Sequence, residues 1–287
     1  MRLHSLGLAT SLLGVVTAAV ALEPANASVE QVVLTRDIAW KPLNPARGDK
    51  GPQAGTLWGD QTAEGPSGFL VKFVDGFASP PHIHNISYRG LVIGGLLHND
   101  DPDAAPMWMP VGSYWTQPAG EAHITAARGV SVAYVEIQDG PYLVRPTDQA
   151  FDNGERPVNL DATNLVWLGS ADTPRVGASP EGERGAEVSF LWGEPKPGRL
   201  SGALVKLPPG FRGVLRSEGD VLRAVVVQGE VRRHTPDASD AQTLEPGSYF
   251  ASAGETPNHL SSGADTESLI YVRTRGRFTI APAAMRD

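Results

Sequence analysis

The chain has 287 residues, enough for two domains at about 150 residues each. It is acidic, with 32 Asp and Glu against 24 Lys and Arg and a formal net charge of −8, and it has no basic run, which excludes nucleic acid as its main partner. The absence of cysteine excludes disulfides, thiolate chemistry and lipid attachment through cysteine.

The first residues have the pattern of a secretory signal peptide. Arg2 precedes an apolar stretch over residues 6–20, and the small residues Ala19 and Ala21 suit a cleavage site. We expect cleavage after Ala21, with Ala27 as the second choice and an uncleaved N-terminal anchor as the alternative. An exported chain without cysteine suits a bacterial periplasm, so we expect a periplasmic protein that leaves the membrane once residues 1–21 are removed.

The remaining sequence contains one unit twice. The stretch LWGDQTAEGPSGFLVKFVDGF from Leu57 reappears as LWGEPKPGRLSGALVKLPPGF from Leu191, and shorter matches follow it in both copies. Each copy has short apolar, β-branched segments between turns rich in Gly, Pro and Asp, and long helical patterns are missing. This self-similarity predicts two all-β domains, each a sandwich or barrel, at residues 28–148 and 160–287, with 146–162 as linker.

Two histidine patterns stand in the first unit. In PPHIHNISYRG, residues 80–90, strand geometry would place His82 and His84 on one face, with Cα atoms about 6.8 Å apart, where both can bind one ion. Alone, this pair is more typical of exposed or hydrogen-bonded strand histidines than of metal ligands. The stretch GSYWTQPAGEAH, which begins at Gly112, ends at His123, and its Gly and Pro residues predict a tight hairpin that holds this third histidine in place.

These patterns resemble the two motifs of the cupin superfamily. His-x-His followed by Gly95, and G-x5-P-x-G-x2-H ending at His123, match those motifs, and the duplication resembles a bicupin. The longer segment over residues 82–127 is similar in sequence to an exported bacterial cupin family of unknown function. The resemblance implies two tandem double-stranded β-helix, or jelly-roll, barrels. Cupins usually place a glutamate ligand where this chain has Tyr88, so the implied metal ligands are His82, His84 and His123 alone.

The second unit has other residues at these positions. An ungapped alignment places Arg216, Glu218 and Leu222 there, and only His259 faces His123. Because an arginine cannot replace an imidazole as a ligand, we expect a degenerate, metal-free second barrel whose pocket is closed by an ion pair between Arg216 and Glu218.

Tyr88 and Gln117 are the candidate catalytic residues. Tyr88 has the parity of the two histidines, so it is expected either to orient substrate or bound water or to pack in the core. Gln117 is expected either to hydrogen-bond a ligand or to stabilise the hairpin. Glu136 is expected to be an outward strand residue, with a late carboxylate ligand as the alternative.

Three further side chains have less specific expected roles. His98 is expected in a surface loop. Trp108 and Trp115 are expected to wall the barrel core or to touch a ligand.

Three imidazoles suit several ions, so we expect one divalent transition metal, Fe, Zn, Ni or Mn, with iron or zinc favoured. Cupin sites of this kind resemble those of Fe(II) dioxygenases that cleave diketones or oxidise thiols. The missing carboxylate raises the charge of the site and favours an anionic, chelating small-molecule substrate. The alternatives are a zinc-dependent binding or sensing module, similar to cupin domains attached to anti-sigma factors, and a structural barrel pair. A homodimer through strand edges stays open.

Overall fold

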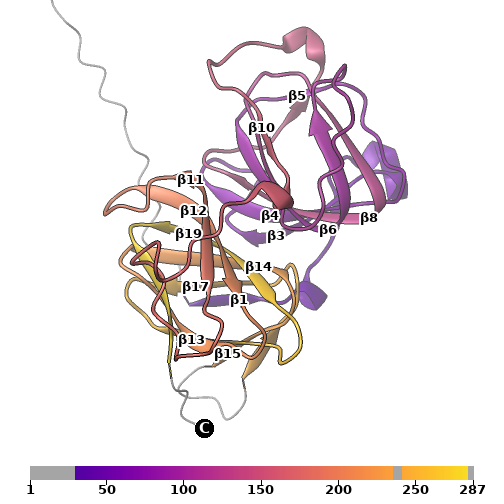
Figure 1. The fold of residues 1–287 in the computed structure, drawn as a ribbon. Helices are drawn as coiled ribbons and strands as arrows, with labels where there is room; N and C mark the ends of the chain where they lie inside the picture. The colour runs from indigo at the N-terminus through magenta and orange to yellow at the C-terminus, as the bar shows by residue number, and fades with distance from the viewer. Residues whose placement is uncertain (1–29, 235–240, 284–287) are drawn as a thin grey trace, which may run out of the picture.

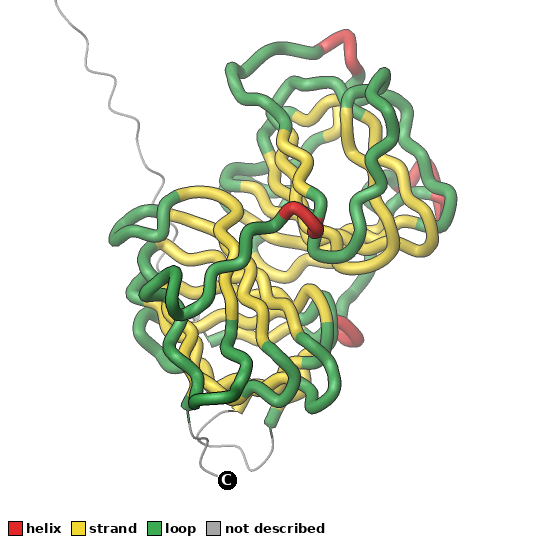
Figure 2. Tube along the Cα trace, in the orientation of Figure 1, coloured by secondary structure: helices red, strands yellow, loops and turns green. Residues whose placement is uncertain are grey.

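The computed structural model describes residues 30–234 and 241–283, and the predicted signal peptide, residues 1–21, lies outside this part of the chain. Within it the secondary structure is almost entirely strand, with four short 3-10 helices (Figure 2). None of the helices in these ranges is both long and apolar enough to cross a membrane.

The chain forms two bodies, each of them one barrel. The first body, or first barrel (Figure 1, indigo to magenta), contains a seven-stranded antiparallel sheet in the order β10-β7-β6-β8-β4-β3-β2 and a two-stranded sheet, β5-β9. Its elements are β2 (Lys41–Pro42), η2 (Pro45–Lys50), β3 (Gln53–Trp58), β4 (Ser67–Phe73), β5 (Ile83–His84), β6 (Tyr88–Asp100), β7 (Tyr114–Gln117), β8 (Ile124–Ile137), β9 (Val144–Arg145), η3 (Thr147–Gln149), β10 (Val158–Leu160) and η4 (Ala162–Asn164).

The second body (Figure 1, orange to yellow) contains a six-stranded sheet in the order β1-β17-β14-β19-β12-β11 and a five-stranded sheet, β16-β15-β18-β13-β20. Its elements are β1 (Gln31–Val33), η1 (Thr35–Asp37), β11 (Glu187–Gly193), β12 (Leu200–Leu207), β13 (Arg212–Ser217), β14 (Val221–Gln228), β15 (Val231–His234), β16 (Gln242–Leu244), β17 (Tyr249–Ala253), β18 (Asn258–Ser262), β19 (Ser268–Arg275) and β20 (Phe278–Pro282).

Each of the two bodies includes one strand from a part of the chain outside its own repeat. β1, near the start of the described chain, pairs with β17 of the second body, and Figure 1 shows this indigo strand among the orange and yellow ones. β10, from the stretch expected to be a linker, pairs with β7 of the first body. The domain limits 28–148 and 160–287 stay a prediction, and these pairings tie each body to a segment from beyond its own repeat.

Strand alternation builds three cores from the repeated unit. On β4, Phe69 and Val71 point into the first barrel, whereas Leu70 points into a cluster shared by the two bodies. On β12, Val205 packs inside the second barrel and Leu204 in the shared cluster. The two barrels therefore pack sheet against sheet across a third hydrophobic core.

The long strand β6 changes face along its length. Its pairing with β8 shifts between Val92 and Gly94 and again between Gly94 and Leu96. Gly95, the glycine of the first motif, has φ +70°, and a Cβ atom there would lie 2.2 Å from the Ser131 hydroxyl oxygen, so no other residue fits without movement. A regular strand would place Tyr88 and Asn99 on opposite faces, because they are an odd number of positions apart. As a result of the irregularity, both face the barrel interior.

Candidate metal centre

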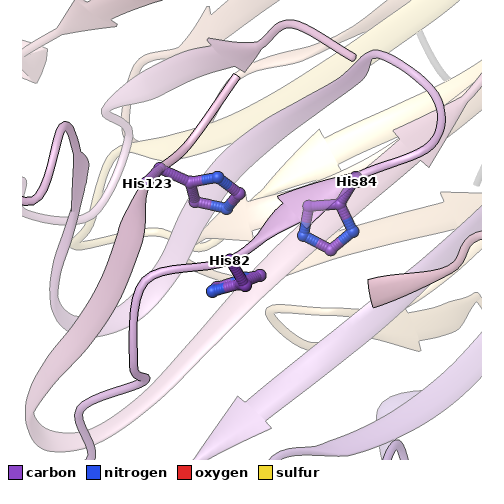
Figure 3. A group of neighbouring side chains, drawn as sticks. All are labelled: His82, His84 and His123. Carbon is purple, nitrogen blue, oxygen red and sulfur yellow. The ribbon is translucent and has the colours of Figure 1, made fainter. Parts of the chain in front are cut away.

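His82, His84 and His123 lie together inside the first barrel. Their nearest ring nitrogens all lie within 4.8 Å of one another, and Figure 3 shows the rings converging on a common space. His82 and His123 face each other through a pair of backbone hydrogen bonds of 3.0 Å each. His84 belongs to β5, whose pairing with β9 fixes its backbone.

Backbone carbonyls orient two of the imidazoles. Nδ1 of His82 lies 2.9 Å from the Pro80 carbonyl oxygen, and Nδ1 of His123 lies 3.3 Å from that of Glu121. When each Nδ1–H donates to its carbonyl, Nε2 keeps the lone pair that a metal ligand needs.

The third imidazole is held by an aromatic neighbour. Tyr142 stacks on His84, with ring centroids 4.3 Å apart, and its hydroxyl lies 3.2 Å from Nε2. Nδ1 of His84 is buried without a hydrogen-bond partner among the described residues. A buried nitrogen in this state costs free energy unless something binds it, so the donor set fits a cation held by three neutral imidazoles.

A buried polar network surrounds His123. The Tyr88 hydroxyl donates to Oδ1 of Asn99 at 3.0 Å and lies 3.4 Å from Nε2 of His123. Asn99 donates to Oε1 of Gln117 at 2.9 Å, and its Oδ1 also accepts a bond of 2.8 Å from Thr125. Gln117 in turn donates to the Glu121 carbonyl at 3.2 Å. Tyr88 and Gln117 therefore both belong to the surroundings of the histidine group, as side chains that fix its geometry.

Burial keeps all three histidines neutral. Burial lowers the pKa of His82, and the charge of Arg47 lowers it further. Burial also holds the pKa of His84 well below its usual range. Burial, followed by the neighbouring His82, lowers the pKa of His123 to about 3. Neutral imidazole is the form that binds metal ions, so the site needs no proton release to accept one near pH 7.

A cavity of about 370 Å³ opens beside the histidines. It is lined by His82, His84, Tyr88, Asn99, Ser79, Thr125, Pro80, Tyr142, Leu143, Val144, Trp115, Val71, Phe73, Phe77, Ala133, Val135, Leu43, Asn44, Pro45, Arg47 and Pro52. This volume suits a small organic molecule, and most of its wall is apolar.

The other sequence candidates lie elsewhere. Glu136 points outward from the first barrel, as expected, but it is buried because it faces the second barrel, where its Oε2 lies 3.8 Å from Nε of Arg273, and it is not a fourth ligand. The expected surface position of His98 is wrong, because it is buried in β6 beside Trp108. Trp115 lines the cavity, whereas Trp108 does not.

Three neighbours of the site were missed by sequence reasoning, namely Asn99, Thr125 and Tyr142. Asn99 falls on the interior face only because of the irregularity in β6. Thr125 has the parity of His123, two residues earlier, and this was the one available signal.

The second barrel differs from the expectation drawn from the ungapped alignment. Arg216 and Glu218 are exposed, and Glu218 lies 3.8 Å from Arg277 instead, so the predicted ion pair is wrong. Leu215 and Ser217 are buried in their place, because a one-residue shift along a strand exchanges its faces.

Asn258 is a buried polar side chain near the end of the second hairpin. It stands next to His259, the residue that the sequence alignment matched to His123. Its Oδ1 accepts a hydrogen bond of 3.3 Å from the buried Arg233, whose guanidinium also forms an ion pair of 2.6 Å with Glu30. Leu215, Leu222 and Phe278 belong to the apolar core that fills this barrel.

Comparison with known proteins identifies the family. A family model described as "Domain of unknown function (DUF4437)" matches residues 31–281, so the chain belongs to this family. No curated protein matches the chain.

Solved structures show the fold. A proposed dioxygenase from Nostoc punctiforme has a TM-score of 0.62 at 15% identity, over 90% of this chain and 87% of that one. Vicilin from hazelnut, Corylus avellana, has a TM-score of 0.53 at 11% identity, over 88% of each chain. A mutant of Bacillus subtilis oxalate decarboxylase has a TM-score of 0.50 at 12% identity, over 88% of this chain and 79% of that one. At these identities the likeness concerns the fold alone, and it confirms the predicted all-β fold of tandem cupin barrels.

Proposed function

We propose that this member of the DUF4437 family binds one divalent transition metal through His82, His84 and His123 and acts there on a small organic molecule. The observation that carries the proposal is the convergence of three imidazoles, two of them buried and that of His82 partly buried, on one space beside a cavity. The contacts of the His82 and His123 Nδ1 atoms with backbone carbonyls leave Nε2 available to a metal, and this supports a bound cation over a set of packed core histidines.

We favour an iron(II)-dependent dioxygenase as the reaction class. Bound iron(II) would supply Lewis acidity and reactivity towards dioxygen. The side chains that line the cavity in the described chain include no carboxylate, so they offer no negative charge to offset a divalent ion. An anionic substrate provides that charge, and this favours enolate-forming or carboxylate substrates over neutral ones.

The protein's own side chains supply positioning and the exclusion of water. Apolar walls such as Phe73, Trp115 and Val135 surround the cavity and strengthen polar interactions within it. Burial raises the pKa of Tyr88 far above its usual range, so its hydroxyl stays protonated and can hold a hydrogen bond to Asn99 or to a ligand atom near His123. This hydroxyl therefore acts as a fixed donor, and proton abstraction is not its task.

Elemental analysis of the purified protein tests the metal site. We expect about one equivalent of metal in the natural protein and in a His259→Ala control, and a loss of metal in His123→Ala. His259 is a partly buried histidine of the second barrel, so the control removes an imidazole without touching the site. A metal content that is equal in all three proteins would contradict the proposal.

Oxygen uptake by the iron-loaded protein tests the reaction class. We expect consumption of dioxygen that depends on an added diketone, thiol or phenolic ketone and disappears in His123→Ala. Tightly bound zinc without turnover would instead support a ligand-binding or sensing module.

We also propose a periplasmic location, supported by the signal-peptide pattern of residues 1–21. Cell fractionation and N-terminal sequencing of the mature protein test it, with a new N-terminus after Ala21 or Ala27 as the expected result.

A further inference from the structure

Arg47 is the one charged side chain among the described residues that line the histidine cavity. It belongs to η2, on a segment from Leu43 to Pro52 that forms one wall of the cavity. A hydrogen bond of 2.9 Å from the Leu43 N–H to the Pro52 carbonyl closes this segment at its base, and Leu43 packs on the core of the first barrel. The segment is therefore anchored at both ends, and it presents Arg47 to the cavity.

The Arg47 side chain has packing partners but no ionic partner. Its guanidinium carbon lies 6.0 Å from the ring centroid of Phe77, and its stem lies against Gly51, where a Cβ atom would come within 2.9 Å of the Arg47 Cβ. Within the described ranges Arg47 forms no ion pair and no side-chain hydrogen bond. Arg47 is exposed, so its N–H donors are hydrated in the free protein and available to a ligand.

The remaining cavity wall specifies what this ligand can be. Val71, Phe73, Phe77 and Val135 make it apolar, while Ser79, Asn99 and Thr125 add uncharged polar groups. An ammonium group would meet Arg47 with no carboxylate nearby to bind it. An organic anion with an apolar body can pair its negative charge with Arg47 and pack its apolar part against the apolar wall.

We propose that Arg47 binds the carboxylate of an apolar organic acid whose body fills the cavity and reaches the histidine group. This specifies the substrate class of the metal centre and rests on the proposed function. Arg47 is then a residue that determines specificity. Because guanidinium and carboxylate form paired, charge-assisted hydrogen bonds, Arg47 separates acids from their neutral amides.

Binding of 3-phenylpropionate and of its amide to zinc-loaded protein, measured by calorimetry, tests the proposal. Zinc keeps the measurement free of turnover. We expect the natural protein to bind the acid at least tenfold more tightly than the amide, and Arg47→Gln to bind the acid about ten- to a hundredfold more weakly with the amide unchanged. Arg47→Lys should fall between them, because it keeps the charge and loses the planar fork.

Lys50→Gln is the matched control, since Lys50 lies on the same segment, is exposed and does not line the cavity. It should bind like the natural protein. Equal affinities for acid and amide, unchanged affinity in Arg47→Gln, or no binding of 3-phenylpropionate, benzoate or hexanoate to the natural protein would each overturn the proposal.

Metal content separates the two proposals. Zinc measured in each sample should stay near one equivalent in Arg47→Gln, so a loss of acid binding there reports on Arg47. A natural protein that binds the acid through Arg47 but holds no metal would support the anion site and contradict the metal centre.

Discussion

Gln117 and His123 hydrogen-bond to the same backbone carbonyl, that of Glu121, at 3.2 and 3.3 Å. The hairpin between β7 and β8 therefore connects the buried amide network to the imidazole that carries the third candidate ligand nitrogen. Partners of this kind fix the tautomer and the orientation of a ligand, and their loss typically lowers metal affinity by about ten- to a hundredfold.

Replacing Gln117 by Ala should weaken metal binding without removing a ligand. The change leaves the Asn99 amide donor buried without its acceptor and leaves His123 as the remaining side-chain partner of the Glu121 carbonyl. We expect a loss of about ten- to a hundredfold in zinc affinity, measured by competition with a chelator, and a loss of about 1–3 kcal/mol in the free energy of unfolding.

Gln228→Ala is the control for that change, because Gln228 is exposed on β14 of the second barrel. An unchanged zinc affinity in Gln117→Ala would show that the network serves the fold and not the site.

The unfolding of the metal-free protein should depend on pH through His123. Its pKa is lowered from 6.5 to about 3 in the folded protein, so between these values the unfolded chain binds a proton that the folded protein does not. The stability that follows from this is complete above pH 6.5 and is lost as the pH falls towards 3. Urea unfolding of the natural protein and of His123→Gln at several pH values isolates the effect.

The difference in unfolding free energy between these two proteins should be constant above about pH 7.5 and should shift by about 1.4 kcal/mol per pH unit below about pH 6, with the natural protein losing more. A constant difference down to pH 4.5 would show that His123 gains its proton as easily in the folded protein as in the unfolded one.

The sequence predicted those parts of the site that depend on local patterns. Tyr88 follows the histidine pair with even spacing, and Gln117 stands in the hairpin motif, so both were placed near His123. Asn99, in contrast, depends on the pairing irregularity at Gly95, which reverses the faces of β6 and cannot be counted from residue spacing. Arg47 comes from a loop that reaches the cavity only through tertiary packing.

Glu136 shows the same limit between domains. It has the parity of Tyr134 on β8, and both point into the space between the barrels, where the Tyr134 hydroxyl donates to Glu136 at 3.1 Å. The repeat predicted two barrels but not which faces they bury against each other. A carboxylate that would be exposed on an isolated barrel is therefore buried beside an arginine of the second.

Glu136→Gln should destabilise the protein and leave its metal content unchanged. The amide still bonds to Tyr134 but removes the negative charge beside the buried Arg273, and the loss of the acidic partner of a buried ion pair should cost about 3–5 kcal/mol of unfolding free energy. Glu187→Gln breaks the more exposed pair with Lys206 and should cost at most about 1 kcal/mol. A loss of metal in Glu136→Gln that exceeds its loss of folded protein would revive Glu136 as a ligand.

Gly95 and Gly129 offer a matched test of the irregularity in β6. Both have φ +70°, so alanine at either position meets the same backbone strain, about 1–2 kcal/mol. At Gly129 nothing lies within 4 Å of the added Cβ, whereas at Gly95 the Ser131 hydroxyl oxygen and Cα lie 2.2 and 2.8 Å away.

Gly95→Ala should therefore cost about 1–3 kcal/mol more than Gly129→Ala in chemical denaturation. It should also weaken zinc binding, because the same turn of the strand carries Asn99 to the interior. Equal costs for the two variants would mean that β6 can rearrange at Gly95, and the inward position of Asn99 would then not depend on that glycine.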